Sequence, residues 1–314
     1  MHIHSHLLSA LIVCGLCSVA LPGCSSVPLS GRNRVNVVSD SQILAMAAQE
    51  YAEFMSTAPR STNVAATRRV VTVGQRIAQA TETYLARAGM PQEAAKFRWE
   101  FNLIRDSQVN AWCMPGGKIA VFEGILPLCP TDDDLATVLS HEVAHAMAKH
   151  ANERMSSQVL QNAGGQVLGS ILGGTLGSMG QVLGGLAYSA GMKYFVDLPY
   201  SRQHEYEADK IGLYLMAMAG YDYTKAVGFW ERMAARSGAN TGSMLSTHPS
   251  DASRIAAIEA EVPNVRAFMA NGGKVVTAPT PIPERNKQAV SAPKQNTTVI
   301  PGNAQRDVPL KTHY

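Results

Sequence analysis

Two histidines four positions apart, His141 and His145, give the clearest chemical signal in the sequence. On a helix, residues i and i+4 project from one face, so the two imidazole rings can share one zinc ion. Glu142 lies about 100° further round the helix, where its carboxylate can act on a water molecule. Zinc lowers the pKa of a bound water to about 7. A glutamate can then take its proton and return it to a leaving amine.

A catalytic zinc needs a third protein ligand and one open position. Position 151, ten residues after His141, is an alanine, so a third histidine is absent at that spacing. Glu205 and Asp209 are again four positions apart, and Gly212 continues their face and permits close approach to another helix. We expect Glu205 to bind the metal and Asp209 to hydrogen bond to the outer nitrogen of a ligand histidine. An exposed Glu205 is the alternative.

Three neighbouring polar residues are expected to have no part in this site. His150 lies on a different face from His141 and His145, which places it at the surface. His204 and Glu207 point away from the face of Glu205 and are expected to be solvated.

The elements that must position these residues form an α+β fold that is mostly helical. Apolar spacing predicts helices at 40–56, 64–88, 131–149, 202–219, 223–236 and 251–262. Thr131 and Asp134 form the capping-box pattern at the start of the third helix. Alternation predicts a strand at 97–104, and a Pro-Gly-Gly turn joins 109–114 to 118–122 as a hairpin. The small sheet thus precedes the helix of His141.

The N-terminal segment has the features of a secretion signal. Residues 7–21 form an apolar run that is short for a membrane span. The run ends in Leu21-Pro22-Gly23-Cys24, which resembles a bacterial lipobox and implies cleavage before Cys24 and its acylation. Ser25 then favours the outer membrane. An ordinary secretory signal with a chance cysteine is the alternative.

The chain accordingly divides into four parts. We expect a lipoprotein signal peptide at 1–23, a polar tether at 24–39, the metal-binding domain at 40–268 and a disordered, proline-rich tail at 269–314. The net charge is +3 and no long basic run occurs, which argues against a nucleic-acid partner. A disulfide between Cys113 and Cys129 is left open, because sequence alone cannot place their Cα atoms within reach.

Glycines recur every fourth residue within the segment 164–191, which carries no charged residue. One interpretation is a membrane-associating or gating hairpin, because small residues at this spacing let helices pack closely in lipid. The preferred interpretation is a closely packed or flexible helical insertion that covers the active site, since polar residues interrupt the apolar face.

Four sequence segments together resemble the gluzincin zinc metallopeptidases, the family of HtpX, LoiP, BepA, the mitochondrial Oma protease and CaaX prenyl protease. They are HEVAH at 141–145, SRQHEYEAD at 201–209, STHPSDASRI at 246–255 and NAWCMPGGKIAVFEGIL at 110–126. The match covers about 40–262 and is most similar to the LoiP-like lipoprotein branch. It implies a zincin-type fold with Glu205 as the third ligand and Asp209 as the partner of a ligand histidine. It also implies that Asn110, Ala111 and Trp112 form the edge strand that pairs with substrate.

The resemblance implies a zinc-dependent endopeptidase with one Zn²⁺ per chain. Its expected substrates are unfolded or misfolded envelope or periplasmic proteins, in protein quality control. Its expected location is the periplasmic side of the outer membrane, bound by the lipid anchor. The alternatives are an envelope chaperone or assembly factor with a latent or structural zinc site and, less favoured, a zinc hydrolase of non-peptide substrates. Glu142 favours an enzyme, because a structural site does not need it.

His248 is the remaining candidate. Pro249 disfavours a helical conformation for it, so it is expected on a loop. The resemblance implies that this histidine faces the zinc. It could stabilise the developing oxyanion, or its neutral nitrogen could fill the open metal position and keep the enzyme latent. Latency is the preferred role, and a surface histidine without function is the third possibility.

Overall fold

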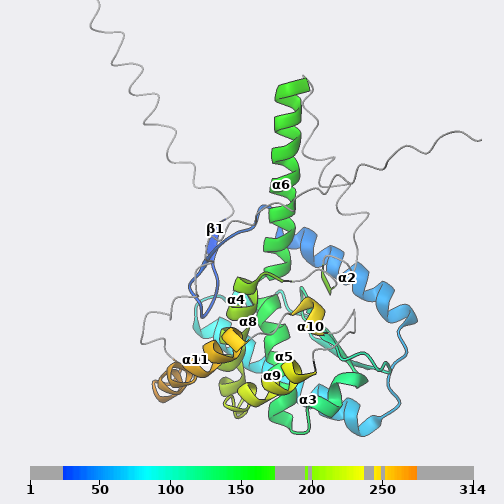
Figure 1. Cartoon of the computed structure of the whole chain (residues 1–314), viewed down its shortest axis with the longest axis vertical. Coiled ribbons are helices and arrows are strands. Elements are labelled where there is room, and N and C mark those ends of the chain that lie inside the picture. The colour runs from blue at the N-terminus through cyan, green and yellow to red at the C-terminus, as the bar shows by residue number, and fades with distance from the viewer. Residues whose placement is uncertain (1–23, 174–194, 197–199, 237–243, 249–251, 274–314) are drawn as a thin grey trace, which may run out of the picture. The chain divides into compact units, whose positions relative to one another are not determined.

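The computed structural model describes residues 24–173, 195–196, 200–236, 244–248 and 252–273 (Figure 1). The predicted signal peptide, residues 174–191 of the glycine-rich segment and the tail from residue 274 lie outside these described residues. The strands are β1 (Cys24–Ser26), β2 (Asn33–Val35), β3 (Glu100–Ile104), β4 (Ala111–Met114) and β5 (Lys118–Phe122). The helices are α2 (Asp40–Thr57), α3 (Val64–Arg87), α4 (Pro91–Ala94), α5 (Asp132–Met147), α6 (His150–Gly173), α8 (Arg202–Met218), α9 (Lys225–Ala235), α10 (Met244–Thr247) and α11 (Ala252–Ala270), with the 3-10 helix η1 at Glu123–Leu128.

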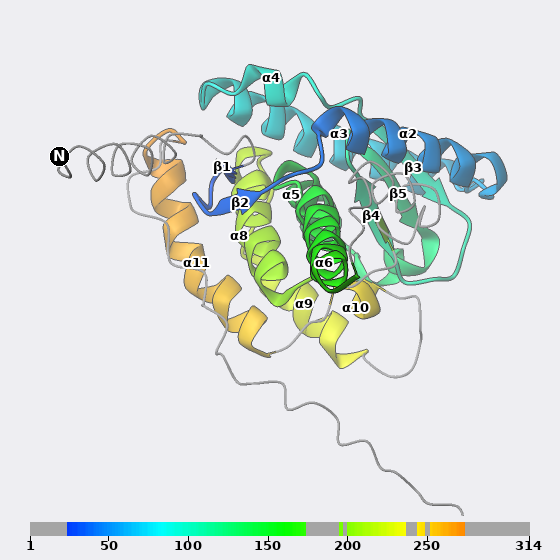
Figure 2. The same ribbon diagram turned by 90° about the horizontal axis from the view of Figure 1, so that it is seen from above.

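Helix α5, which carries the histidine pair, lies at the centre of the packing. Figure 2 shows α11, α8 and α5 side by side, with the sheet beyond α5. The predicted capping box is confirmed: the Thr131 hydroxyl accepts the Asp134 N–H, and the Asp134 carboxylate accepts the Thr131 N–H. Gly212 of α8 faces α5, where a Cβ atom would lie 3.3 Å from the backbone nitrogen of His141. The small residue therefore permits the close approach of the two helices that the sequence predicted.

The three-stranded sheet has the order β3-β5-β4. β3 runs parallel to β5, and β4 pairs antiparallel with β5 through a turn in which Gly116 and Gly117 have positive φ. Within the described part of the chain β4 pairs only with β5, so it forms an edge. β3 begins at Glu100 rather than at residue 97, because the chain before it faces this turn instead of a strand: Arg98 N–H donates to Gly116 O.

The segment predicted as a polar tether is folded onto the domain. β1 and β2 pair antiparallel, and the segment 24–35 is called the N-terminal arm below. Val27 and Leu29 are buried and belong to the main apolar core. Arg34 is 4 % exposed and donates from Nη1 to Ala148 O at the end of α5. The prediction of a free tether over 24–39 was therefore wrong, because it weighed overall polarity above these apolar anchors.

Three further findings bear on the sequence analysis. Helix α11 was predicted to end at 262 but continues through Pro263 to Ala270, because Val265 and Phe268 are buried against the core. Cys113 and Cys129 are both buried free thiols, so the disulfide that was left open does not form in this structure. Among the described residues, no helix combines the length and hydrophobicity needed to cross a bilayer.

Candidate metal centre

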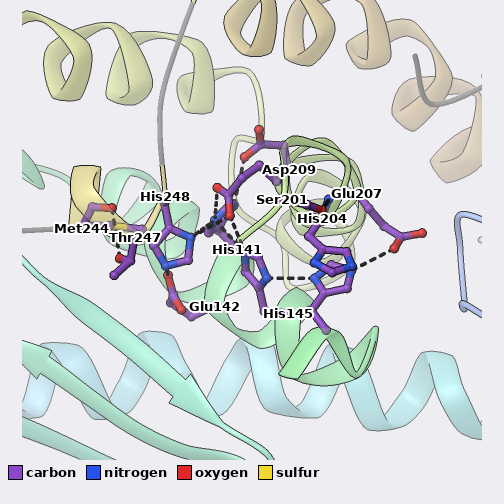
Figure 3. A network of polar contacts seen from close by, with 12 residues as sticks. His141, Glu142, His145, Ser201, His204, Glu207, Asp209, Met244, Thr247 and His248 are labelled. Atoms are coloured by element: carbon purple, nitrogen blue, oxygen red, sulfur yellow. Dashed lines mark hydrogen bonds and ion pairs between the residues drawn. The ribbon is translucent and has the colours of Figure 1, made fainter. Parts of the chain in front are cut away.

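Four buried residues bring one donor atom each to a common point: His141, His145, Glu205 and His248 (Figure 3). Helix α5 supplies the first two, α8 supplies Glu205, and His248 follows α10. The Nε2 atoms of His141 and His145 are 3.1 Å apart, and His248 Nδ1 is 3.2 Å from His141 Nε2. Glu205 Oε1 is 3.0 Å from His248 Nδ1 and 3.4 Å from His145 Nε2.

These separations fit a zinc ion. In a tetrahedral site with bonds of about 2.0–2.1 Å, neighbouring ligand atoms are about 3.3 Å apart. The four separations given above lie between 3.0 and 3.4 Å, and all the donor atoms of the group lie within 4.8 Å of one another. Three imidazoles and one carboxylate are also ligands that zinc prefers. The four residues that would hold the ion therefore match it in chemistry and in spacing.

Glu142 lies beside this group without joining it. Its Oε1 makes no hydrogen bond within the described part of the chain, and His248 Nε2 is 3.5 Å away. Burial raises the pKa of Glu142, although His248, His141 and the backbone N–H of Cys113 oppose the rise. A buried carboxylate with a raised pKa and a free oxygen is suited to accept a proton near neutral pH.

Asp209 holds the outer nitrogen of His141, Nδ1, as the sequence predicted. His141 Nδ1 lies 2.9 Å from Asp209 Oδ1, and Arg254 binds both oxygens of Asp209 at 2.7 and 2.8 Å. Burial opposes a charge on His141, but its hydrogen bonds to Asp209 and Glu205 outweigh burial and raise its pKa to about 9. Metal binding must displace the proton, so zinc affinity should fall with falling pH.

The sequence patterns did not identify Arg254 of α11 as part of the site. It is 1 % exposed, lies 2.9 Å from Glu205 Oε2, and covers the Trp230 ring at 4.3 Å. Burial alone would raise the pKa of Glu205, but His248 and Arg254 hold it well below its ordinary value. No spacing rule joins Arg254 to α8, since the contact spans separate helices. Its place within the segment 246–255, six residues after His248, could have pointed to it.

The predictions for His150 and Glu207 were wrong, because both side chains are fully buried. His150 Nδ1 lies 2.8 Å from the outer nitrogen of His145, and His150 Nε2 lies 2.8 Å from Glu207 Oε2. His204, also expected in solvent, is 8 % exposed and stacks on His150 with ring centres 4.3 Å apart. Burial, with His141 and His248 nearby, holds the pKa of His145 well below its ordinary value, so its ring stays neutral.

His248 sits in a short segment that is tied to both sides of the site. Its own N–H donates to Met244 O at 2.7 Å, and Met244 N–H donates to Val109 O beside β4 at 2.9 Å. On the other side, Tyr200 N–H donates to Thr247 O at 3.1 Å. The segment holds His248 among the metal donors rather than at the surface.

The predicted substrate edge runs past Glu142. Ala111 and Trp112 begin β4, while Asn110 precedes it and accepts the Phe122 N–H at 3.0 Å. Cys113, two residues further on, donates its backbone N–H to Glu142. Trp112 packs against Phe54 with ring centres 5.0 Å apart, which fixes the strand.

The helix of the histidine pair, the glutamate from a following helix and the adjacent sheet edge define a zincin-type metallopeptidase. The sequence model of peptidase family M48 matches residues 72–262, and the chain belongs to this family. Zinc as cofactor and metalloendopeptidase activity follow from that membership and from the donor group.

The relatives of this chain are named as metalloendopeptidases and assembly proteases. Mitochondrial metalloendopeptidase OMA1 of Schizosaccharomyces pombe is 36 % identical, over 76 % of this chain and 67 % of that protein. OMA1 of Saccharomyces cerevisiae is 37 % identical, over 50 % of this chain and 45 % of that protein. The β-barrel assembly-enhancing protease of Escherichia coli is 27 % identical, over 52 % and 34 %. The chain thus spans about two thirds of the first relative and less than half of the other two.

Proposed function

We propose that this chain hydrolyses peptide bonds of envelope or periplasmic proteins, in protein quality control. One observation carries the enzymatic part: the buried Glu142 presents a free oxygen beside a four-donor metal group. The envelope part is supported by relatives named for enhancing β-barrel assembly, because such barrels are characteristic of bacterial outer membranes. The lipobox-like sequence before Cys24 supports the same compartment.

Each site residue has a role in the proposed reaction. His141, His145 and Glu205 would hold the zinc, which would polarise the carbonyl as a Lewis acid and lower the pKa of water. Glu142 takes the proton of the attacking water and returns it to the leaving amine. Asp209 fixes the His141 ring, so that its inner nitrogen stays directed at the metal position.

The edge strand β4 suggests how the substrate lies. An extended peptide can add to an exposed strand edge by backbone hydrogen bonds, which suits chains that have lost their fold. Asn110, Ala111 and Trp112 would supply this edge, beside Glu142. A compact non-peptide substrate would make no use of such an edge, so a peptide is favoured.

Digestion of unfolded casein by the purified full chain tests this function. Glu142→Gln should lower the rate by about 10²–10⁴-fold, since it removes the general base, and should leave the zinc content unchanged. Glu259→Gln, at an exposed position of α11, is the matched control and should behave as wild type. A chelator should stop the reaction. Full turnover by Glu142→Gln would refute the assignment.

A second function, an envelope chaperone or assembly factor with a latent zinc site, is favoured by the position of His248. A catalytic site keeps one position open, but His248 Nδ1 lies among the other donor atoms, 3.2 Å from His141 Nε2 and 3.0 Å from Glu205 Oε1. In the proposed enzyme this arrangement is a resting state, and His248 must move before a substrate carbonyl can enter.

Kinetics of His248→Ala on unfolded casein separate the possible roles. A residue that blocks the metal predicts a rise in basal proteolysis, whereas an oxyanion donor predicts a lower kcat. A chaperone with a structural zinc predicts no proteolysis by either protein. Wild-type rates in the variant would reject both catalytic roles.

We further propose that Cys24 is acylated and holds the chain at the periplasmic side of the outer membrane. Cys24→Ser should leave the precursor uncleaved or release the protein from the membrane fraction. Unchanged fractionation together with unchanged lipid labelling would contradict this proposal.

A further inference from the structure

The outer nitrogen of His145 meets an imidazole rather than a carboxylate. His145 Nδ1 and His150 Nδ1 are 2.8 Å apart, and both rings are buried. Figure 3 shows the line that continues from His145 through a second ring to Glu207. His150 Nε2 and Glu207 Oε2 are again 2.8 Å apart. A ligand histidine, a neutral histidine and a carboxylate thus form one chain of hydrogen bonds.

The direction of these hydrogen bonds follows from the chemistry of imidazole. A metal-binding His145 uses the lone pair of Nε2, so its proton is on Nδ1 and must be donated outward. His150 Nδ1 can accept it only if the His150 proton is on Nε2. Glu207 has acceptors only, so it requires that same tautomer by taking the Nε2–H. A ring that accepts at Nδ1 and donates from Nε2 carries one proton and is therefore neutral.

Glu207 is in turn fixed by the N-terminal arm. Ser30 Oγ donates to its Oε1, and Arg32 donates to its Oε2 from Nε at 2.9 Å and from Nη2 at 2.7 Å. Arg32 also binds Glu153 through both terminal nitrogens, at 2.6 and 2.7 Å. The guanidinium therefore bridges the carboxylates of Glu207 and Glu153 and holds both in place.

Packing alone does not explain this arrangement. An apolar side chain could fill the buried space behind His145 without burying a carboxylate and a guanidinium, which costs solvation free energy. The donors and acceptors from His145 to Arg32 instead match at each step. Three separate segments, α6, α8 and the N-terminal arm, meet to provide them.

We propose that His150 and Glu207 are positioning residues for the metal ligand His145, and that Arg32 fixes Glu207 in this role. The inference rests on the proposed zinc site. His150 does not touch the metal position; it selects the tautomer and orientation of His145. Glu207 selects the tautomer of His150, and the N-terminal arm becomes part of the support of the metal site.

The test uses the full chain with zinc affinity as the readout, measured by competition with a chelating dye. His150→Phe keeps a ring in the buried space and removes the acceptor, and should weaken zinc binding by about 10–100-fold. His150→Gln should restore much of the affinity, because its amide oxygen accepts from His145 and its N–H donates to Glu207. Glu207→Gln keeps nearly the shape of the wild-type side chain. It should weaken zinc binding, as His150→Phe does, but by a smaller factor.

His204→Phe is the matched control. It changes the ring that stacks on His150, is also buried, and has no hydrogen bond to His145. It should leave zinc affinity unchanged. The absorption spectrum of the cobalt-substituted protein gives a second readout: His150→Phe should alter the metal-centred bands and His204→Phe should not.

The possible outcomes distinguish a positioning role of His150 from a packing role. If His150→Phe binds zinc as tightly as His204→Phe and shows the wild-type cobalt spectrum, the positioning role is wrong and His150 is only packing. If His150→Phe does not fold, Glu207→Gln carries the comparison with His204→Phe. Wild-type zinc affinity together with the wild-type cobalt spectrum in Glu207→Gln would likewise overturn the proposal. If the wild-type chain binds no zinc, the proposed metal site itself fails, which is a separate result.

Discussion

The two ligand histidines of α5 are supported in different ways. His141 contacts a carboxylate directly, and Arg254 holds that carboxylate, Asp209, by two hydrogen bonds. His145 reaches the carboxylate of Glu207 only through the neutral ring of His150. The first support uses α8 and α11, whereas the second uses α6, α8 and the N-terminal arm.

The two supports show two ways to tune a metal ligand: a neighbouring charge at His141 and a neutral ring that fixes direction at His145. Beside His141, a negative carboxylate raises the basicity of the ring, consistent with its pKa of about 9. Beside His145, an intervening imidazole transmits direction but places the charge one ring further away. We infer that the Asp209 side mainly sets how strongly the metal is held. The Glu207 side mainly sets where His145 points.

The strongest prediction compares two glutamates on the same helix. Glu205→Ala should reduce zinc from one ion per chain to almost none, because it removes a ligand. Glu207→Gln should retain the zinc at saturating metal, because every ligand remains. Metal analysis of both purified proteins provides the measurement. Equal loss or equal retention would contradict the division between ligand and support.

The next prediction concerns Arg254, the cation of the direct support. Arg254→Ala leaves Asp209 and Glu205 buried without their partner and should destabilise the fold by about 3–5 kcal/mol. Arg232→Ala is the control: its side chain is 43 % exposed and pairs with Asp134, so the expected loss is about 0–1 kcal/mol. Urea unfolding of the metal-free proteins measures both. Equal losses would show that burial does not govern these pairs.

A smaller effect is expected for Asp209→Asn. The amide oxygen can still accept from His141, but the negative charge is lost, so zinc affinity should fall by about 10–100-fold. The pH dependence of zinc binding should move as well, because the pKa of His141 falls without the Asp209 charge and protons then compete less. Chelator competition from pH 6 to about 9 tests both expectations. An unchanged pH profile would show that charge at Asp209 has no influence on His141.

The smallest effect is expected at Glu153, which shares Arg32 with Glu207 on the side of the site that supports His145. Burial alone would raise the pKa of Glu153, but hydrogen bonds from Arg32 and His204 lower it to about 2 from an ordinary value of 4.5. A lowered folded-state pKa contributes stability above pH 4.5, and that stability is lost as the pH falls toward 2. Wild type should therefore exceed Glu153→Gln in Tm at neutral pH, and the two should converge in acid. A constant difference across this range would assign the effect to packing.

The misplacement of His150 shows where prediction from local pattern failed. The sequence suggested one helix to residue 149, and His150 was placed by its angle on that helix. In the structure α5 ends at Met147, and Lys149 has a left-handed φ of 58° that redirects the chain into α6. Lys149 Nζ lies 2.6 Å from Asp40 Oδ2 and 2.8 Å from Glu93 Oε2, on separate elements. No neighbouring residue in the sequence signals this turn.

The sequence by itself determined the features that follow from helical and strand periodicity. The spacing of His141, Glu142 and His145 placed two ligands and a base on one helix, and the same spacing paired Glu205 with Asp209. The edge hairpin was likewise readable from alternation and its Pro-Gly-Gly turn. These features depend on residues within one or two turns of each other, where backbone geometry alone fixes direction.

Only the tertiary structure decided which faces become buried. The geometry of α8 alone predicts that Glu207 faces solvent. In the folded chain Ser30 and Arg32, more than 170 residues away in the sequence, cover that side. His248 and Arg254 likewise reach the metal group from segments whose paths no local pattern sets. Burying charged residues is costly unless partners meet them, and only the folded chain brings those partners together.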